Sequence, residues 1–292
     1  MSINFSTLQG LTIPQGVVTQ VADAAGNVLW AVSGWPDDLD TGLEFVSASA
    51  FTISVSRQWD GTMEYCNGEG WQTWIGGKIS SGETEKGHCI YVRGTGNTKI
   101  ITSSSFPWTF TGSNIECNGN IEKLLDYATV MAGKHPTMGT KCFQYMFSGC
   151  TSLITAPSLP ATTLAEYCYY HMFKRCINLI TAPSLPATTL APLCYSYMFY
   201  GCSKLTGVPS LPATTLVNRC YNSMFYNCKK IKVSSTASGT YKKAYRIPYS
   251  GTGTDDGSSN PTALMFVGTG GTFTGAPTIN TTYYLDSSNT IV

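Results

Sequence analysis

Short stretches of alternating apolar and polar residues fill the first third of the chain, separated by clusters of turn residues. The strand-like runs lie at 43–46, 51–55, 71–75, 89–93, 99–102 and 108–111. Many short strands with frequent turns are typical of two packed antiparallel sheets. We therefore predict a β-sandwich-like domain over residues 34–117.

Ahead of this domain, two β-rich stretches at 17–21 and 28–32 lie on either side of the turn residues 23–27. This pattern predicts a β-hairpin within residues 1–33. Because a lone hairpin is only marginally stable in water, we expect it to dock on another protein or on the next domain. The candidate anchoring residues are Ile13, Val17, Val21, Val28 and Trp30.

Apolar residues at helical spacing follow the predicted sandwich. One face would carry Ile121, Leu124, Leu125, Ala128 and Met131, and Gly133 is placed to end the helix. The composition changes at the same place, because all six tryptophans fall before residue 110 and most cysteines fall after 140. We predict a domain boundary here and a cap helix at about 120–132 that covers the first turn of the next domain.

From residue 142 onward the apolar pattern repeats every 26 residues. Met-Phe pairs occur at 146–147, 172–173, 198–199 and 224–225. Two cysteine series keep the same interval, Cys142, Cys168, Cys194, Cys220 and Cys150, Cys176, Cys202, Cys228. A fixed period of about 20–50 residues is typical of a solenoid, in which each coil is too small to bury its own apolar face. We predict a solenoid over residues 118–233.

Each coil has its own expected parts. Leu164, Cys168, Met172 and Phe173 lie at helical spacing, which predicts one short helical turn with these side chains pointing inward. Residues 153–157 are the best strand candidate. Residues 265–277 resemble 198–209 with one insertion, so we expect 234–292 to be a loop followed by a degenerate capping repeat.

Composition and charge narrow the function classes. Charged residues make up 12% of the 292 residues, and the formal net charge is +1. A near-neutral chain gains little from counterion release, so we expect no nucleic-acid partner. No apolar run approaches the roughly 18–20 residues that span a bilayer, so we expect no membrane insertion. The first ten residues lack the basic and apolar segments of a secretory signal, so we expect the chain to stay in the cytosol unless something else carries it out.

The eleven cysteines allow three interpretations. The spacing within a coil is C-x7-C, without the short C-x2-C pairs typical of zinc sites, so we predict no metal. Disulfides would need an oxidising compartment. The favoured interpretation is two ladders of buried thiols, since a free cysteine packs as a small apolar side chain. Pairing of Cys66 with Cys89 stays open.

No convincing catalytic set emerges, so we predict no enzymatic activity and no cofactor. His88 adjoins Cys89, but neighbours on a strand point to opposite faces. His171 stands in a column that the other coils fill with Tyr or Ser, so we expect a surface position for it. Trp71 and Trp74 fit either a ligand platform or a core, and core packing is the favoured interpretation.

Binding has more support than catalysis. The columns that vary between coils are rich in Tyr, Ser and Asn, a mixture that gives adaptable contacts in antibody loops. By helical spacing they face away from the predicted core, although an ordinary solvated face is an equal alternative. The candidate receptor-binding residues are Tyr145, Tyr170, His171, Lys174, Tyr197, Tyr200, Asn222 and Tyr226. The lysines at 229–243 are solvated or meet an acidic glycan.

The repeat also carries a resemblance. Cys-Tyr-x-x-Met-Phe-x-x-Cys-x-x-Leu, followed by Ala-Pro-x-Leu-Pro-Ala-Thr-Thr-Leu, resembles the leucine-rich repeats of BspA-like surface proteins. Residues 11–30 and 270–284 are similar to the starts and ends of tail-fibre or other minor structural proteins of gut-bacterial phages and prophages. The expected fold class is therefore α+β, with an N-terminal β-hairpin, a β-sandwich-like domain and a leucine-rich-repeat-like solenoid.

The resemblance implies a function by analogy, since fold alone does not establish one. It implies a virion structural protein that attaches to the host cell envelope through its solenoid. Its partners would be other virion proteins at the N-terminus and a host cell-surface glycan or protein. A trimer stays open, because fibres are often trimeric. The alternatives are a capsid fibre or decoration protein without a receptor role, a bacterial BspA-like adhesin, and an envelope-degrading enzyme.

Overall fold

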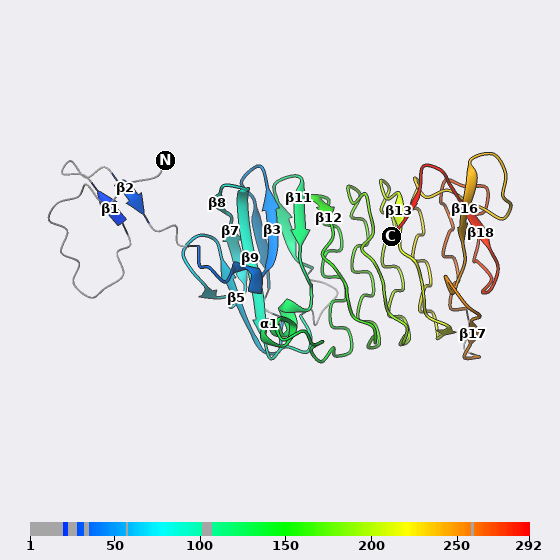
Figure 1. Cartoon of the computed structure of the whole chain (residues 1–292), viewed down its shortest axis with the longest axis horizontal. Helices are drawn as coiled ribbons and strands as arrows, with labels where there is room; N and C mark the ends of the chain where they lie inside the picture. Colours follow the sequence, from blue (N-terminus) through cyan, green and yellow to red (C-terminus); the bar gives the residue numbers. More distant parts are fainter. Residues whose placement is uncertain (1–19, 23–27, 32–34, 57, 101–106, 258–259) are drawn as a thin grey trace.

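The computed structural model describes residues 20–22, 28–31, 35–56, 58–100, 107–257 and 260–292. The described chain is mostly β, with one short α-helix and several small sheets (Figure 1). In those ranges no helix has the length and apolar character needed to cross a bilayer. The α+β class overestimates the helix content of the described residues. The helical turns expected in each coil take another conformation, described below.

The predicted N-terminal strands are present. β1 (Gln20–Ala22) pairs antiparallel with β2 (Val28–Ala31), and Val21 lies opposite Trp30 in the register. The backbones of Val21, Val28 and Trp30 are thus in these strands. Ile13, Val17 and the expected turn at 23–27 lie outside the described residues.

Two sheets make up most of the region that follows, residues 35–118, here called the two-sheet region, and the larger sheet also takes in residues 153–155 of the first coil. The larger sheet has the order β12-β11-β3-β9-β5-β6, with β8 paired to β9. Its strands are β3 (Leu43–Ser47), β5 (Thr62–Cys66), β6 (Gln72–Thr73), β8 (Gly82–Thr84), β9 (Gly87–Thr95), β11 (Ile115–Asn118) and β12 (Leu153–Thr155). The smaller sheet has the order β10-β4-β7, from Thr109–Thr111, Thr52–Val55 and Gly77–Ser80.

The apolar faces of the two sheets pack on each other. Alternate residues of β3 are buried, and the ring of Phe45 lies 5.5 Å from that of Phe110 on β10. Residues 99 and 100, the first half of the strand predicted at 99–102, are not in a strand. Ile100 instead donates its backbone N–H to the carbonyl of Cys142, because this segment lies against the first coil.

The predicted helix is α1 (Lys123–Met131), which packs against β9 and the short 3-10 helix η2 (Leu39–Thr41). It breaks at Asp126, whose carboxylate accepts the backbone N–H groups of Gly96 and Thr129. Leu124 and Leu125, before the break, are buried. Ala128 and Met131 are exposed, so the expectation that they share the buried face is wrong.

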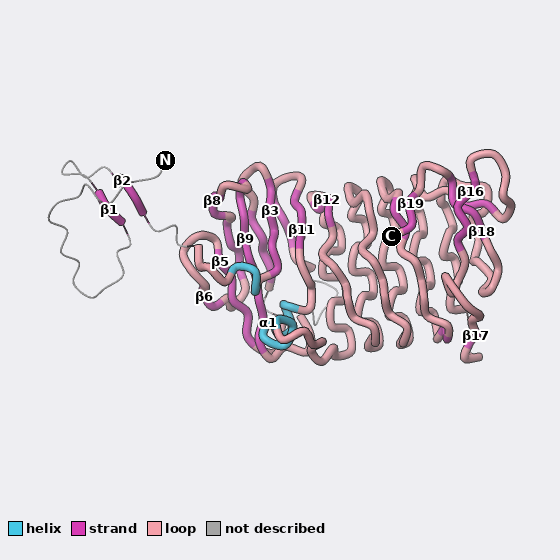
Figure 2. The backbone as a smooth tube through the Cα atoms, viewed as in Figure 1, coloured by secondary structure: helices cyan, strands magenta, loops and turns pink. Residues whose placement is uncertain are grey.

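The remaining chain, residues 139–292, forms what we call the stack. Five segments lie side by side in it, 141–149, 167–175, 193–201, 219–227 and 260–268, which we call the turn segments (Figure 2). Alternate N–H groups reach the next segment; that of Phe143 donates to the carbonyl of Cys168 at 2.8 Å and that of Tyr169 to Cys194 at 3.0 Å. The other N–H groups donate to the carbonyl three residues earlier in the same segment.

Left-handed residues explain why these segments are not helical. Every fourth residue has a positive φ, including Tyr145 (58°), His171 (56°) and Tyr197 (56°). Each left-handed residue interrupts the right-handed turn, so a helix cannot propagate. Along a segment, two residues that point inward therefore alternate with two that point outward. The predicted helical turn is therefore wrong, although Cys168, Met172 and Phe173 do point inward.

Parallel pairing holds the other sides of the coils together. β12 pairs with β11, and β13 (Gly207–Val208) pairs with β19 (Thr290–Ile291). On the next side, β14 (Thr215–Leu216) pairs with β17 (Thr254–Asp255). Single bridges join Thr163 to Thr189 and Thr181 to Gly207. The strand candidate 153–157 is thus strand over the first three residues.

Columns of identical side chains fill the stack. The rings of Phe147, Phe173, Phe199, Phe225 and Phe266 lie nearly parallel, with centroids 5.5–5.7 Å apart. Met146, Met172, Met198 and Met224 are fully buried, as the repeat predicts. Phe147 also meets Trp108 of the two-sheet region at 6.5 Å, so one core runs through both parts.

A small sheet closes the far end of the stack. It consists of β15 (Val233–Ser234), β18 (Tyr283–Asp286) and β16 (Tyr241–Tyr245). The ring of Tyr245 meets that of Phe266 edge-on at 6.3 Å, and its hydroxyl donates to the carbonyl of Pro209. The buried side chain of Asn289 bonds the carbonyls of Thr206 and Lys230 and the N–H of Lys232. The expected loop at 234–261 therefore contains β16 and β17.

Candidate recognition surface

The outward side of the turn segments gathers most of the candidate receptor-binding residues. His171 stacks between Tyr145 and Tyr197, with ring centroids at 4.7 and 4.5 Å. Tyr197 meets Tyr200 at 6.0 Å, and Tyr200 stacks on Tyr226 at 4.8 Å. With Tyr170, which touches the first three rings, these residues form what we call the aromatic strip: Tyr145, Tyr170, His171, Tyr197, Tyr200 and Tyr226.

The repeat itself builds this strip. Tyr145, His171 and Tyr197 occupy the same left-handed position in three neighbouring turn segments. Their side chains therefore leave the backbone in the same direction and stack in register. The ring faces cover one another, and the free edges carry the tyrosine hydroxyls, which donate and accept hydrogen bonds.

Two candidates are less accessible than predicted. The side chain of His171 is only 6% exposed, so its expected surface position is wrong; the rings on both sides cover it. Asn222 is 8% exposed, and Gln144 and Ser196 of the same column are also buried. The hydroxyl of Ser196 donates to the backbone carbonyl of Asn222 at 3.3 Å. This side chain therefore points toward the next coil and not into solvent.

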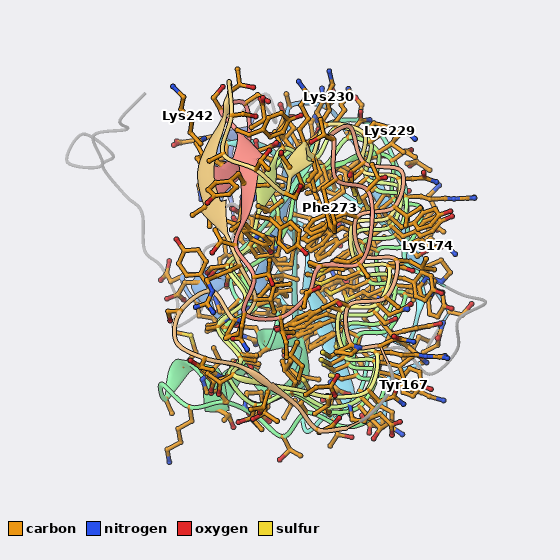
Figure 3. The ribbon with its side chains drawn as sticks, turned by 90° about the vertical axis from the view of Figure 1, so that its right-hand side faces the viewer. Tyr167, Lys174, Lys229, Lys230, Lys242 and Phe273 are labelled. Atoms are coloured by element: carbon orange, nitrogen blue, oxygen red, sulfur yellow. The ribbon has the colours of Figure 1, made fainter. Side chains whose placement is uncertain are left out.

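The strip is uncharged at neutral pH. Burial, with a smaller contribution from Lys174, lowers the pKa of His171 to about 3. Burial and the neighbouring tyrosines raise the pKa of Tyr170 to about 12. Two cations lie at its borders, where the ammonium groups of Lys141 and Lys174 lie 5.6 Å from the ring centres of Tyr167 and Tyr200. Tyr167 and Lys174 project from the same side of the molecule (Figure 3).

The lysines at 229–243 do not act as one group. Lys243 bonds the backbone carbonyl of Ser287, and Arg246 bonds that of Gly251. Lys230 and Lys232, with Lys204, line a cavity of about 420 Å³ beside Ile180. Lys229 and Lys230 project at the top of the view in Figure 3.

The cysteines are all buried, as their interpretation as small apolar side chains predicts. Thiols of the second series donate to the preceding coil; those of Cys176 and Cys202 reach the carbonyls of Phe147 and Phe173 at 3.0 Å. Cys66 and Cys89 are free thiols. Throughout the part of the chain that the structure describes, no three His, Cys, Asp or Glu side chains gather as a metal site.

The other candidate chemical groups have structural contacts. His135 meets the buried carboxylate of Glu122 at 2.7 Å. Trp74 is 3% exposed and packs against Trp59 and Trp108, as the core interpretation predicts. Trp71 instead lies under the guanidinium of Arg93, 3.9 Å from its ring centre.

Comparison of the chain with protein-family models, with curated proteins and with solved structures gives no match.

Proposed function

We propose that the chain is an attachment protein of a bacteriophage or prophage virion that binds the host cell envelope through the aromatic strip. In this proposal the two-sheet region is a β-sandwich and the stack is a solenoid of the leucine-rich-repeat type, similar to the repeats of BspA-like proteins. The carrying observation is the continuous run of neighbouring rings from Tyr145 to Tyr226, in which the tyrosines are partly exposed.

The strip has the properties of a recognition surface. Tyrosines that stack on each other lose little further entropy on binding, and their hydroxyl edges suit ligands rich in hydrogen-bonding groups. Because the strip is neutral, it suits a host glycan or protein surface better than a polyanion. Lys174 and Lys141 at its borders add directional contacts.

The hairpin of β1 and β2 would provide the anchor to other virion proteins. It is a two-stranded sheet of its own, and such a hairpin gains stability by docking. Cross-linking of an intact particle, followed by mass spectrometry, tests this anchor. Cross-links from residues 1–33 to a second virion protein support the proposal, and cross-links confined to the chain itself contradict it.

Binding to cells tests the strip. We expect the labelled full chain to bind to a susceptible strain in a panel of gut-bacterial cells, and the triple variant Tyr170→Ala, Tyr197→Ala, Tyr200→Ala to lose at least about tenfold in affinity. Tyr249→Ala is the matched control, because Tyr249 is 44% exposed and lies outside the strip. Equal binding by the triple variant, with an unchanged fold by circular dichroism, contradicts the proposal.

These two measurements, together with an assay for fragments released from purified envelopes, separate the alternatives. A decoration protein without a receptor role is incorporated into particles but does not bind cells. A bacterial adhesin binds cells and has no virion partner. An envelope-degrading enzyme releases soluble fragments from purified envelopes, whereas the proposal expects none.

A further inference from the structure

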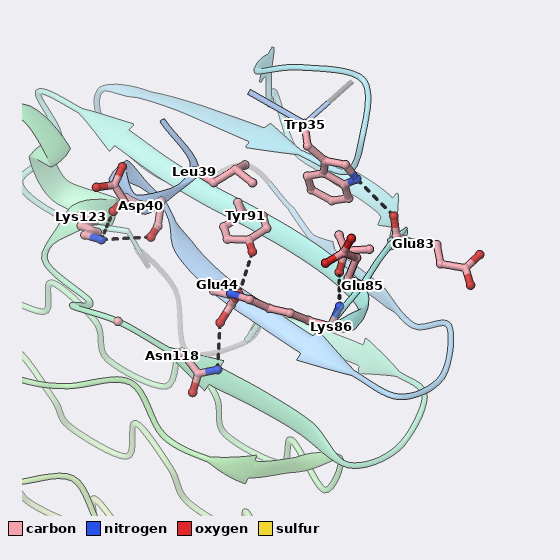
Figure 4. Close-up of a pocket in the computed structure, with 13 residues that line it drawn as sticks. Trp35, Leu39, Asp40, Glu44, Glu83, Glu85, Lys86, Tyr91, Asn118 and Lys123 are labelled. Atoms are coloured by element: carbon pink, nitrogen blue, oxygen red, sulfur yellow. Dashed lines mark hydrogen bonds and ion pairs between the residues drawn. The ribbon is translucent and has the colours of Figure 1, made fainter. Parts of the chain in front are cut away.

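A second cavity lies in the two-sheet region, on the face of the larger sheet that points away from the shared core. Its volume is about 820 Å³, within the range of about 300–1,000 Å³ typical of small-molecule sites. Figure 4 shows it between the segment at Trp35 and the strands β3, β8 and β9. The receptor-binding proposal makes no use of it.

Strand register builds the floor of this cleft. Glu44 on β3 lies opposite Tyr91 on β9 and opposite Asn118 on β11. Three residues far apart in the sequence thus form one row across three adjacent strands. Because Leu43 and Phe45 point into the core, the alternation along β3 turns Glu44 to the outer face.

Glu44 is a fixed hydrogen-bond acceptor in this row. Its carboxylate accepts from the hydroxyl of Tyr91 at 2.7 Å, the amide of Asn118 at 3.0 Å and the ammonium of Lys86 at 3.2 Å. Burial opposes ionisation, but these three donors hold the pKa of Glu44 below its usual value. A carboxylate has about four acceptor positions, so one stays free for a ligand.

An aromatic wall stands beside the acceptor. The ring of Trp35 meets Tyr91 edge-to-face at 5.7 Å, and its indole N–H donates to the carbonyl of Glu83 at 3.2 Å. A Cβ on Gly82 would come within 3.0 Å of the Trp35 ring, so the ring sits tightly over that strand. Figure 4 shows the Trp35 ring and its hydrogen bond to Glu83.

The charges of the cleft select against anions. Its lining includes the carboxylates of Asp40, Glu44, Glu83 and Glu85 and the ammonium groups of Lys86 and Lys123. Both ammonium groups already have partners, because Lys86 pairs with Glu44 and Lys123 bonds the carbonyls of Asp40 and Gly42. An anionic ligand would therefore meet uncompensated negative charge.

We propose that this cleft binds a neutral carbohydrate, with an apolar C–H face of the sugar on Trp35 and a sugar hydroxyl donating to Glu44. A sugar ring combines an apolar face with several hydroxyl donors, which matches an aromatic wall beside a fixed acceptor. A wholly apolar ligand would bury Glu44 without adding a hydrogen bond, which costs free energy.

Titration calorimetry and saturation-transfer NMR on the full chain test this site. The probes are the methyl glycosides of glucose, galactose, mannose, rhamnose and N-acetylglucosamine, with glucuronic acid and trilysine as charged comparisons. We expect at least one neutral glycoside to bind. We expect Trp35→Ala and Glu44→Gln each to weaken that binding by about tenfold, because the first removes the aromatic wall and the second replaces an ionised acceptor with a neutral amide that forms a weaker hydrogen bond.

Glu44→Gln preserves the row, because the Asn118 amide can rotate and the Tyr91 hydroxyl can reorient to suit the new amide. Glu116→Gln, at an exposed position of β11, is the matched control and should bind as the wild type does. The proposal is overturned if no neutral glycoside binds, if both cleft variants bind normally, or if glucuronic acid or trilysine binds more tightly. The triple strip variant keeps glycoside binding, which separates this site from the receptor-binding proposal.

Discussion

The thiol of Cys176 donates a hydrogen bond to the backbone carbonyl of Phe147, in the preceding coil, at 3.0 Å. The same carbonyl accepts the N–H of Cys150 in its own coil. Cys202 and Cys228 repeat this contact one and two coils further on. The second cysteine series therefore links each coil to the one before it, in addition to filling space.

Thiol reactivity follows from this burial. Burial raises the pKa of Cys176 and Cys202 well above the usual value, and only a thiolate reacts rapidly with alkylating agents. We expect iodoacetamide at neutral pH to leave the repeat cysteines unmodified in the folded protein and to modify them in urea. Peptide mass spectrometry measures this, and modification of the folded protein at the rate of the unfolded chain would contradict it.

The phenylalanine column sets much of the stability of the stack. Phe199 is fully buried between Phe173 and Phe225. We expect Phe199→Ala to lower the free energy of unfolding by about 3–5 kcal/mol, through lost transfer energy and the cavity left behind. Ile177→Ala, at a side chain that is 41% exposed, should change it by less than about 0.5 kcal/mol. Urea unfolding compares the two, and equal losses would contradict the prediction.

His171 makes stability depend on pH. Its pKa falls from 6.5 to about 3 on folding, so the unfolded chain takes up the proton first as the pH drops. The stabilisation is fully present above pH 6.5 and is lost progressively toward pH 3. We expect His171→Tyr, the residue of the neighbouring coils, to lose less stability than the wild type over this range. Parallel thermal unfolding curves at each pH give the difference, and identical slopes for both proteins would contradict it.

The left-handed positions give a purely conformational test. Gly149 has φ near 80°, and a Cβ placed on it would meet nothing within 4 Å. We expect Gly149→Ala to destabilise the protein by about 1 kcal/mol, because an L-residue pays for this conformation without any clash. Gly149→Asn should cost less, since Asn tolerates left-handed φ better. Chemical unfolding checks the order, and equal stability of all three proteins would contradict it.

The repeat made the interior of the stack predictable, while its local backbone was not. Met172 and Phe173 recur at a fixed interval, so burial of both could be expected in every coil. The helical expectation rested on the spacing of Leu164 and Cys168, which a run of turns also satisfies. The residue types at Tyr145, His171 and Tyr197 do not indicate a positive φ. The backbone hydrogen bonds to neighbouring coils impose that conformation.

The cleft lay beyond the reach of local patterns for a different reason. Glu44, Tyr91 and Asn118 are neighbours only through the pairing of β3 with β9 and β11. Trp35 lies between Gly34 and Pro36, outside every predicted strand, yet its ring forms one side of the cleft. Glu83 and Glu85 are both exposed, but Glu83 belongs to strand β8 and only Glu85 lies in the turn that follows it.

Equivalent backbone groups of adjacent coils bond to each other along the whole row of turn segments. If one 26-residue coil is deleted, the N–H groups of the coil before it therefore face the same carbonyl groups in the coil after it. During evolution the stack could therefore lose or gain whole coils. The two-sheet region at one end and the sheet of β15, β18 and β16 at the other would keep their contacts. The number of coils would then be a quantity that selection adjusts without changing the contacts at either end of the stack.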